Sequence, residues 1–261
     1  MTTEAAARTS KASTSKVLVS GVTKRFGEVT ALTEVDLVLG DREFVSVVGA
    51  SGCGKSTLLS IIAGLEEPTA GTASISGQEI LGPGRDRGVV FQQSTLLPWL
   101  SALDNVVFAL DGETGMTRRD RVDRAREVLD QVSLTGFENS FPAQLSGGMQ
   151  QRVALARSLA YGPDVLLMDE PFGALDALTR RTMQELLTQV WEKHRMTVML
   201  ITHDIEEAVF LSDRVVAMTP RPGRVAAEYV IDLPRPRDPE VLGSPEFHHY
   251  YTEILGLIHK G

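Results

Sequence analysis

The chain has 261 residues, of which 43% are hydrophobic, and its 26 basic and 34 acidic side chains leave a formal net charge of −8. This length and composition support one large domain, or one domain with an inserted subdomain, and argue against a fully disordered chain. Because general affinity for nucleic acid comes mostly from lysine and arginine, the acidic balance predicts no nucleic-acid partner. Cys53 is the single cysteine, which excludes a disulfide within the chain and favours a reducing compartment.

The first 16 residues, MTTEAAARTSKASTSK, are small and polar and contain no apolar stretch like that of a signal peptide. We predict a disordered tail over residues 1–16. Further along, no apolar run approaches the roughly 18 residues needed to cross a bilayer. We therefore expect that the chain by itself forms no membrane channel.

Three runs rich in strand-forming residues come next, at residues 16–22, 31–39 and 43–48. The third run ends in Gly49, and residues 55–64 follow with apolar side chains at three- and four-residue spacing, which is typical of a helix. A strand, a glycine-rich loop and a helix in this order are the start of an α/β unit.

Residues 92–160 have a different pattern. The stretch 117–132 is charged with a single apolar stripe, and Thr117 stands where an N-cap would, so we predict a helical insertion. Strand signals resume at residues 165–168 and 197–202, with a helical segment at 178–194 between them. A strand, a helix and a strand at this spacing argue for a parallel sheet.

The end of the chain combines an irregular segment and a helix. Residues 219–238 are rich in proline and arginine, and a last helix is predicted to start at Ser244-Pro245. One face of this helix would carry Phe247, Tyr251, Ile254 and Ile258.

Residues 49–56, Gly-Ala-Ser-Gly-Cys-Gly-Lys-Ser, match the phosphate-binding loop pattern G-x-x-x-x-G-K-[ST]. Glycines let the backbone curl so that several N–H groups point at phosphate oxygens, and the following helix adds its positive end. Lys55 would supply a charge to the β- and γ-phosphates, and the Ser56 hydroxyl would ligate Mg²⁺. The predicted nucleotide-binding residues here are Gly49, Ser51, Gly52, Cys53, Gly54, Lys55, Ser56 and Thr57.

The apolar run at residues 165–168 ends in two carboxylates, Asp169 and Glu170. Asp169 at the end of a strand can hold Mg²⁺, as in other phosphate-loop proteins. Glu170 is then the candidate general base that accepts a proton from the attacking water. The alternative is an ordinary buried strand followed by a charged turn.

A second candidate anion site opens at Ser146. The sequence Leu-Ser-Gly-Gly-Met-Gln-Gln-Arg over residues 145–152 begins a helical stretch, so Ser146 and the amides of Gly147 and Gly148 would stand at a helix N-terminus. From the residues alone, a phosphate site and a plain helix cap are equally good interpretations.

LSGG followed by QQR, downstream of a phosphate loop and just before an apolar strand ending in DE, resembles the ATP-binding subunits of ABC transporters. The likeness extends over about residues 17–235, and bacterial importers for nitrate, taurine and other sulfonates are the most similar, taurine-type importers above all. The resemblance implies an α/β fold, namely a phosphate-loop NTPase core with a mostly parallel sheet, an N-terminal antiparallel β part and a helical subdomain inserted at 92–160. Residues 236–261 would form a C-terminal helical tail.

The resemblance also implies roles for single residues. Phe26 matches the aromatic residue that stacks on adenine, and Gln92 matches the glutamine that senses Mg²⁺ and water and connects to the membrane partner. Asp176 matches an acidic residue near the dimer seam, and His203 matches the histidine that contacts the γ-phosphate. The competing interpretations are, in the same order, a packing aromatic, a strand-end amide, a helix N-cap and a structural histidine. At Met149 the chain departs from the more usual glutamine, and methionine cannot donate a hydrogen bond to phosphate.

The resemblance implies a homodimer in which two copies pair head to tail. The Ser146 loop of one copy would lie across ATP bound with Mg²⁺ on the Lys55 loop of the other. An integral membrane permease and, through it, an external substrate-binding protein would be the further partners, at the cytoplasmic face of the membrane. The segment 96–100, Leu-Leu-Pro-Trp-Leu, would either contact the permease or pack in the core.

Three functions remain open at this point. The first is an ATPase that powers import of a small anion, taurine or another sulfonate, with nitrate as the alternative. The second is a soluble ABC-type ATPase that serves iron–sulfur assembly or DNA repair, and the third is an exporter or a lipoprotein-release ATPase. The phosphate loop and Ser146 are separated by only a modest helical insert, which argues against DNA repair, because those relatives carry long coiled-coil insertions.

Overall fold

The computed structural model describes residues 15–260. Most of the predicted disordered tail, residues 1–14, lies outside this range, and the prediction was wrong for Ser15 and Lys16, which belong to the first strand. The described chain forms two compact units. Unit 1 combines the part of the chain up to Gly84 with the part from Met196 onward, and unit 2 runs from Arg85 to Arg195.

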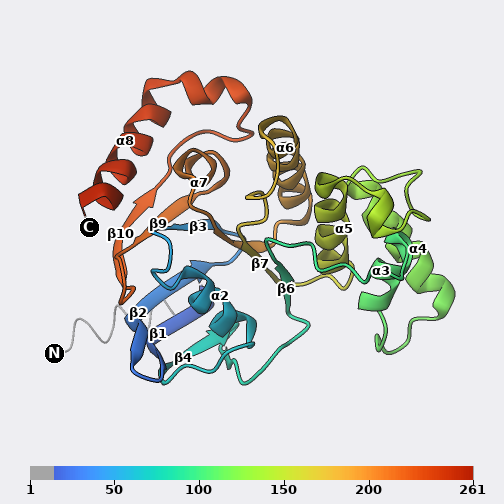
Figure 1. Ribbon diagram of the computed structural model, residues 1–261, viewed down its shortest axis with the longest axis horizontal. Helices are drawn as coiled ribbons and strands as arrows, with labels where there is room; N and C mark the ends of the chain where they lie inside the picture. The colour runs from blue at the N-terminus through green and yellow to red at the C-terminus, as the bar shows by residue number, and fades with distance from the viewer. Residues whose placement is uncertain (1–14, 261) are drawn as a thin grey trace. The chain divides into compact units, whose positions relative to one another are not determined.

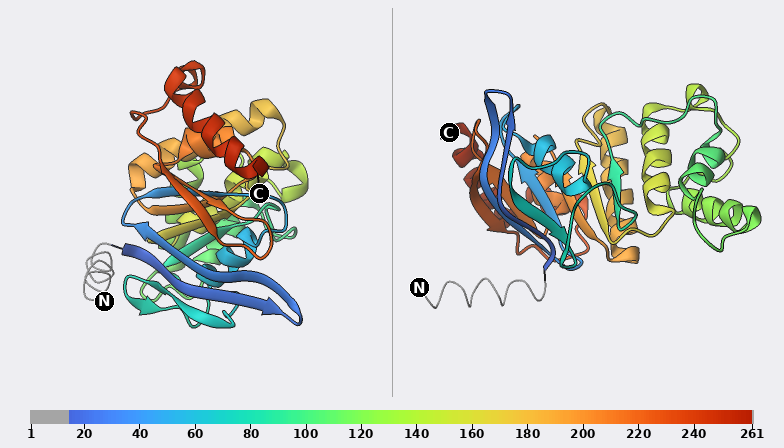
Figure 2. Two further views of the ribbon diagram at one scale, coloured as in Figure 1. Left: turned by 90° about the vertical axis from the view of Figure 1, so that its left-hand side faces the viewer. Right: turned by 90° about the horizontal axis from the view of Figure 1, so that it is seen from below.

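Unit 1 contains an antiparallel sheet near the N-terminus, as predicted. Its strands lie in the order β2-β1-β4-β5, and the long β1–β2 hairpin with β4 beside it is drawn in blue and teal in Figure 2. The bounds are β1 (Ser15–Phe26), β2 (Val29–Gly40), β4 (Ala70–Ile75) and β5 (Gln78–Glu79). Alternate side chains of β1, such as Val17 and Val19, are buried, which is the pattern of a sheet with one covered face.

Unit 1 also contains parallel strands. Strand β3 (Phe44–Val48), which is buried along its whole length, lies between β8 (Thr197–Ile201) and β9 (Arg214–Met218), and both neighbours run parallel to it. The edge strand β10 (Val225–Val230) pairs antiparallel with β9. The helices of this unit are α2 (Lys55–Ala63), α7 (Ile205–Leu211), the 3₁₀ turn η2 (Pro239–Gly243) and α8 (Pro245–Lys260).

Unit 2 holds the parallel pair β6 (Arg87–Val90) and β7 (Val165–Asp169). Its helices are α3 (Ala102–Ala109), α4 (Arg118–Gln131), the 3₁₀ turn η1 (Pro142–Gln144), α5 (Gly147–Leu159) and α6 (Ala177–His194). Helices α3, α4 and α5 pack on one another, in green and yellow in Figure 1. Helix α4 begins at the predicted N-cap, where Thr117 and Asp120 form a capping box.

Several elements, β4 and β5 among them, have no counterpart in the sequence-based prediction. Strand β10 lies within the proline- and arginine-rich segment 219–238, and the short helices α3 and α7 had no signal long enough to read. Helix α8 begins at Pro245 as predicted, with Phe247 and Ile254 buried. Within residues 15–260, no helix is both long enough and apolar enough to cross a bilayer.

Candidate nucleotide-binding site

The phosphate loop of unit 1 connects β3 to α2. Gly54, at the N-cap of α2, has a φ of 101°, and a Cβ there would lie 2.6 Å from Leu32 Cδ2 and 3.0 Å from Ala31 O. A side chain is thus excluded both by backbone conformation and by the close approach of β2. The glycine pattern of the loop therefore has a steric basis in this fold.

Lys55 is buried within the curl of its own loop. Its ammonium Nζ donates hydrogen bonds to Gly49 O at 2.8 Å and Ala50 O at 3.1 Å, and Cys53 Sγ lies 3.9 Å away. These contacts fix the charge at the N-terminal end of α2, where the first N–H groups have no carbonyl partner within the helix. A lysine ammonium group beside a helix N-terminus attracts negative charge, so this place is suited to bind a polyphosphate.

Unit 1 also brings His203 to the same sheet edge. Val47 of β3 is in register with Ile201 of β8, and Thr202 N donates to Val47 O at 3.3 Å. Because both strands are parallel, the loop after β3 and the exposed His203 after β8 leave the sheet side by side. This placement is compatible with a phosphate contact by His203, which remains a prediction.

Phe26 ends β1 and is 48% exposed. The ammonium Nζ of Lys24 lies 4.8 Å from its ring centroid, which is a cation–π distance. Such exposure disfavours the packing interpretation, and adenine stacking remains a prediction.

In unit 2, Gln92 and the two carboxylates Asp169 and Glu170 lie at the ends of neighbouring parallel strands, β6 and β7. Val90 of β6 is in register with Met168 of β7, so Gln92 and Glu170 leave the sheet at one edge. A Cβ placed on Gly173 would lie 3.2 Å from Gln92 Nε2 and 3.7 Å from Glu170 Oε2, so the amide and the carboxylate converge on this glycine. Glu170 has a φ of 45°, in the left-handed region that residues other than glycine adopt rarely.

Ser146 caps α5, and Asp176 caps α6. Ser146 Oγ accepts a hydrogen bond from Met149 N at 3.3 Å. Asp176 accepts hydrogen bonds from Thr179 N at 3.0 Å and from Thr179 Oγ1 at 2.7 Å, and these bonds lower the pKa of the Asp176 carboxyl. A Cβ on Gly148 would lie 2.4 Å from Thr179 Cγ2, so the two helix starts touch. The cap interpretation is confirmed at both residues, while the phosphate contact of Ser146 and the dimer-seam role of Asp176 remain predictions.

Sequence reasoning missed the residues of α5 that hold the backbone around Gln92. The buried Gln151 Nε2 donates to Gln92 O at 2.6 Å and Phe91 O at 3.2 Å. Arg157 donates to Ser94 O and Thr95 O. Helix α5 thus fixes the segment that carries Gln92. The glutamine in QQR was the only available signal, and residue type alone does not say which carbonyls it meets.

The residues present fit Mg²⁺, which prefers oxygen ligands. Ser56 offers a hydroxyl in the first turn of α2 in unit 1, and Asp169 offers a carboxylate at the end of β7 in unit 2. Gln92 in unit 2 would add an amide oxygen. Their joint coordination of the ion remains a prediction.

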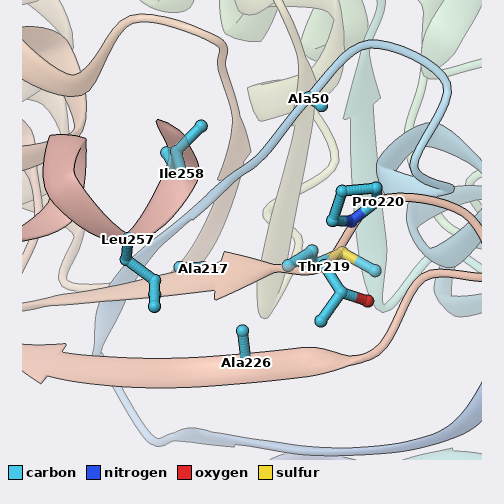
Figure 3. Close-up of a pocket in the computed structure, with 8 residues that line it drawn as sticks. Ala50, Ala217, Thr219, Pro220, Ala226, Leu257 and Ile258 are labelled. Carbon is cyan, nitrogen blue, oxygen red and sulfur yellow. The ribbon is translucent and has the colours of Figure 1, made fainter. Parts of the chain in front are cut away.

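An apolar cavity of about 190 Å³ lies behind the phosphate loop in unit 1 (Figure 3). Ala50 of the loop lines one side, Ala217 and Ala226 belong to β9 and β10, and Leu257 and Ile258 project from α8. Its lining lacks the charged groups that a phosphate needs, so we assign no nucleotide contact to it.

Comparisons with known proteins agree with this geometry. The ABC transporter family matches residues 32–173, more than half of the chain. The nitrate import ATP-binding protein NrtD of Synechocystis sp. is 48% identical over 238 residues, covering 89% of each chain. The taurine import ATP-binding protein TauB of Rhizobium johnstonii is 50% identical over 243 residues, covering 90% of this chain and 92% of that protein.

A solved structure is also similar. The ATP-binding cassette MJ0796, in a dimeric post-hydrolysis state bound to ADP and Pi, is 38% identical, with a TM-score of 0.73 over 83% of this chain and 99% of that chain. The family match, the similar proteins and the similar structure all point to the family that the phosphate loop and the LSGG sequence resemble. The chain belongs to the ABC transporter family and is one of its ATP-binding subunits, an ATPase.

Proposed function

We propose that the chain is the ATP-hydrolysing subunit of a membrane importer for a small anion, taurine or another sulfonate, with nitrate as the alternative. The support is the likeness to import ATP-binding proteins for nitrate and for taurine over about nine tenths of the chain. The observation that carries the catalytic part is the convergence of Gln92 and Glu170 on Gly173 at the end of β7.

In this proposal each copy binds ATP through the phosphate loop, Lys55 and His203 of unit 1. The Ser146 loop from unit 2 of a second copy, with Gly147 and Gly148, covers the γ-phosphate, so neither copy alone completes a site. A head-to-tail pair of this kind is an isologous interface with nucleotide in the seam. The dimeric state named for the similar MJ0796 cassette supports such a pair.

Hydrolysis would then depend on positioning and charge. Glu170 accepts the proton of the attacking water, and Gln92 orients that water through its amide. Lys55 balances the negative charge that shifts to the leaving oxygen. Mg²⁺, when bound, neutralises charge on the phosphate oxygens.

A membrane partner is supported by exposed aromatic side chains in unit 2. Trp99 is 69% exposed, and Phe137 and Phe141 are exposed as well. The start of α3 ties their segments together, because Ala102 N donates to Ser140 O and Leu103 N to Glu138 O, both at 2.8 Å. Exposed aromatic side chains on segments that are joined by these hydrogen bonds could together contact a cytoplasmic segment of a permease. The subunit would then act at the cytoplasmic face of the membrane, and a binding protein outside would deliver the anion.

The test is to purify the chain with its permease and binding protein, reconstitute the complex in lipid, and measure ATPase stimulation. Taurine, a longer alkanesulfonate and nitrate are added in separate experiments. We expect a sulfonate to stimulate hydrolysis and nitrate to have little effect. If nitrate alone stimulates hydrolysis, the transported anion is nitrate and not a sulfonate. If the chain binds no permease and still has full ATPase activity, the result favours the soluble, non-transport function.

A further inference from the structure

The loop between β9 and β10, residues 219–224 with the sequence Thr-Pro-Arg-Pro-Gly-Arg, lies against the phosphate loop within unit 1. Arg221 Nε donates a hydrogen bond to Gly52 O at 3.2 Å. A Cβ on Gly223 would lie only 1.9 Å from Cys53 O. The β9–β10 loop thus contacts two consecutive carbonyl groups of the phosphate loop.

These contacts determine where the neighbouring N–H groups point. In a planar trans peptide, the carbonyl and the following N–H point in opposite directions. Since Gly52 O faces Arg221, Cys53 N–H turns away from it into the curl, where it donates to Ala50 O at 3.3 Å. Since Cys53 O faces Gly223, Gly54 N–H is turned away from the β9–β10 loop in the same manner. The Cys53 N–H therefore closes the curl of the loop, and the Gly54 N–H lies on the concave side, where a backbone N–H can bind an anion.

The β9–β10 loop is itself anchored. Gly223 N donates to Ala31 O at 2.9 Å, and Gly223 O accepts from Thr33 N at 3.1 Å, so strand β2 holds this residue on both sides. Thr219 N donates to Arg224 O at 2.9 Å and closes the loop. Because strand β2 fixes the β9–β10 loop, this loop can hold the carbonyl groups of Gly52 and Cys53 in one orientation.

We propose that Arg221 and Gly223 are positioning residues for nucleotide binding. They hold the peptide groups 52–53 and 53–54 with their carbonyls outward, which keeps Cys53 N–H on Ala50 O and leaves Gly54 N–H facing the β-phosphate of a nucleoside di- or triphosphate. Neither residue belongs to the phosphate-loop pattern, and Arg221 acts through Gly52 rather than by touching the nucleotide. The inference rests on nucleotide binding at the Lys55 loop.

The test uses the full chain with Arg221→Ala, and Arg224→Ala as the matched control from the same loop. Affinity for MgADP and MgATP is measured by calorimetry, together with KM, kcat and Tm. We expect Arg221→Ala to weaken both nucleotides about three- to tenfold, the size expected for one exposed charged hydrogen bond, with kcat within about twofold and Tm nearly unchanged. Arg221→Lys, which keeps the charge and one donor, should regain part of the affinity, and Arg224→Ala should match the wild type.

A second pair of variants tests the steric contact. In Gly223→Ala the new methyl group meets Cys53 O, whereas in Gly243→Ala it enters open space. We expect weaker nucleotide binding for the first variant only.

Two outcomes overturn the inference. One is unchanged affinity in Arg221→Ala. The other is a loss of affinity, kcat and Tm together in that variant, since this means that Arg221 only supports folding. The variant Lys55→Ala tests the nucleotide site on which this inference depends. If Lys55→Ala binds nucleotide as tightly as the wild type, nucleotide does not bind at this loop, and the assignment of the site itself is wrong.

Discussion

Asn105 holds the backbone of Leu97 by both of its polar groups. Asn105 Oδ1 accepts a hydrogen bond from Leu97 N at 2.8 Å, and Asn105 Nδ2 donates to Leu97 O at 3.2 Å. The same Nδ2 donates to Leu100 O and Ser101 O. Asn105 is completely buried at the start of α3, while Trp99 on the turn that it fixes is exposed. One buried amide therefore supports the surface assigned above to the permease.

Asn105→Ala leaves the buried backbone groups of this turn without their partner. We expect the free energy of unfolding to fall by about 1–3 kcal/mol. Urea unfolding measures this loss. A stability equal to that of the wild type would show that the turn does not depend on Asn105.

Trp99→Ala should leave the stability of the chain unchanged but weaken its contact with the permease. The side chain is 69% exposed, so we expect stability within about 0.5 kcal/mol of the wild type and normal ATP binding. Co-purification of the permease should weaken, because an aromatic anchor of the contact is lost. If the permease co-purifies in the usual amount, the assignment of this surface is wrong.

Glu170→Gln keeps the size of the side chain but removes the base. We expect ATP binding to persist and kcat to fall by about 10²- to 10⁴-fold, the usual contribution of a general base. Glu185→Gln is the control, since Glu185 pairs with Arg181 along α6 at 3.3 Å and has no role in the proposed site. Hydrolysis at the normal rate by Glu170→Gln would falsify the role of Glu170.

Gln151→Ala removes the donor that fixes Gln92 O and Phe91 O. Because Gln92 would then lose its fixed backbone, we expect kcat to fall while KM for ATP changes little. Stability should fall by about 1–3 kcal/mol, since two acceptors lose their partner. Gln189→Ala on the exposed side of α6 is the control. A change confined to KM would contradict this role.

Alkylation of Cys53 should block ATP binding, and ATP should protect the thiol. Cys53 is 1% exposed and its Sγ lies 3.9 Å from Lys55 Nζ, so a reagent reaches it only when the phosphate loop opens. We expect slow labelling by iodoacetamide in the folded chain and slower labelling still with MgATP. Since Cys53 is the single cysteine, mass spectrometry reports this site alone. Full activity after stoichiometric modification would refute the prediction.

Acid should destabilise unit 1 through Glu43. Burial raises the pKa of this carboxyl, but hydrogen bonds from Arg214 and from Gly40 N, together with the charge of Arg214, outweigh burial and hold the pKa below its ordinary value of 4.5. Arg214 Nε and Nη2 donate to Glu43 at 2.7 and 2.8 Å. The folded chain thus binds the proton more weakly than the unfolded chain. This stabilisation is complete above the ordinary pKa and is lost as the pH falls through the lower, folded value.

The measurement is urea unfolding of the wild type and of Glu43→Gln from about pH 6 to about pH 3. We expect the wild type to be more stable at the upper end by about 1 kcal/mol, and the difference to shrink on acidification. A constant difference across this range would exclude the Glu43–Arg214 pair as its source.

The sequence was sufficient to predict those features that depend on contacts between residues close together along the chain. The cap residues Thr117, Ser146 and Asp176 each bond to a group three residues along the chain, so a short stretch of sequence predicts them. The phosphate loop between β3 and α2 is also readable, because glycine, lysine and serine at fixed spacing leave few other uses. The parallel strands followed from the strand–helix–strand order.

Tertiary structure alone decided which distant groups meet. Gln151 and Gln92 are 59 residues apart, and Arg221 and Gly52 are 169 residues apart. In both pairs the acceptor is a backbone carbonyl, which every residue possesses, so no pattern in the sequence marks it. Only the packing of α5 on the segment after β6, and of the β9–β10 loop on the phosphate loop, selects those carbonyls. The sequence therefore determined the chemical groups of the site, and the fold determined which peptide groups hold them in place.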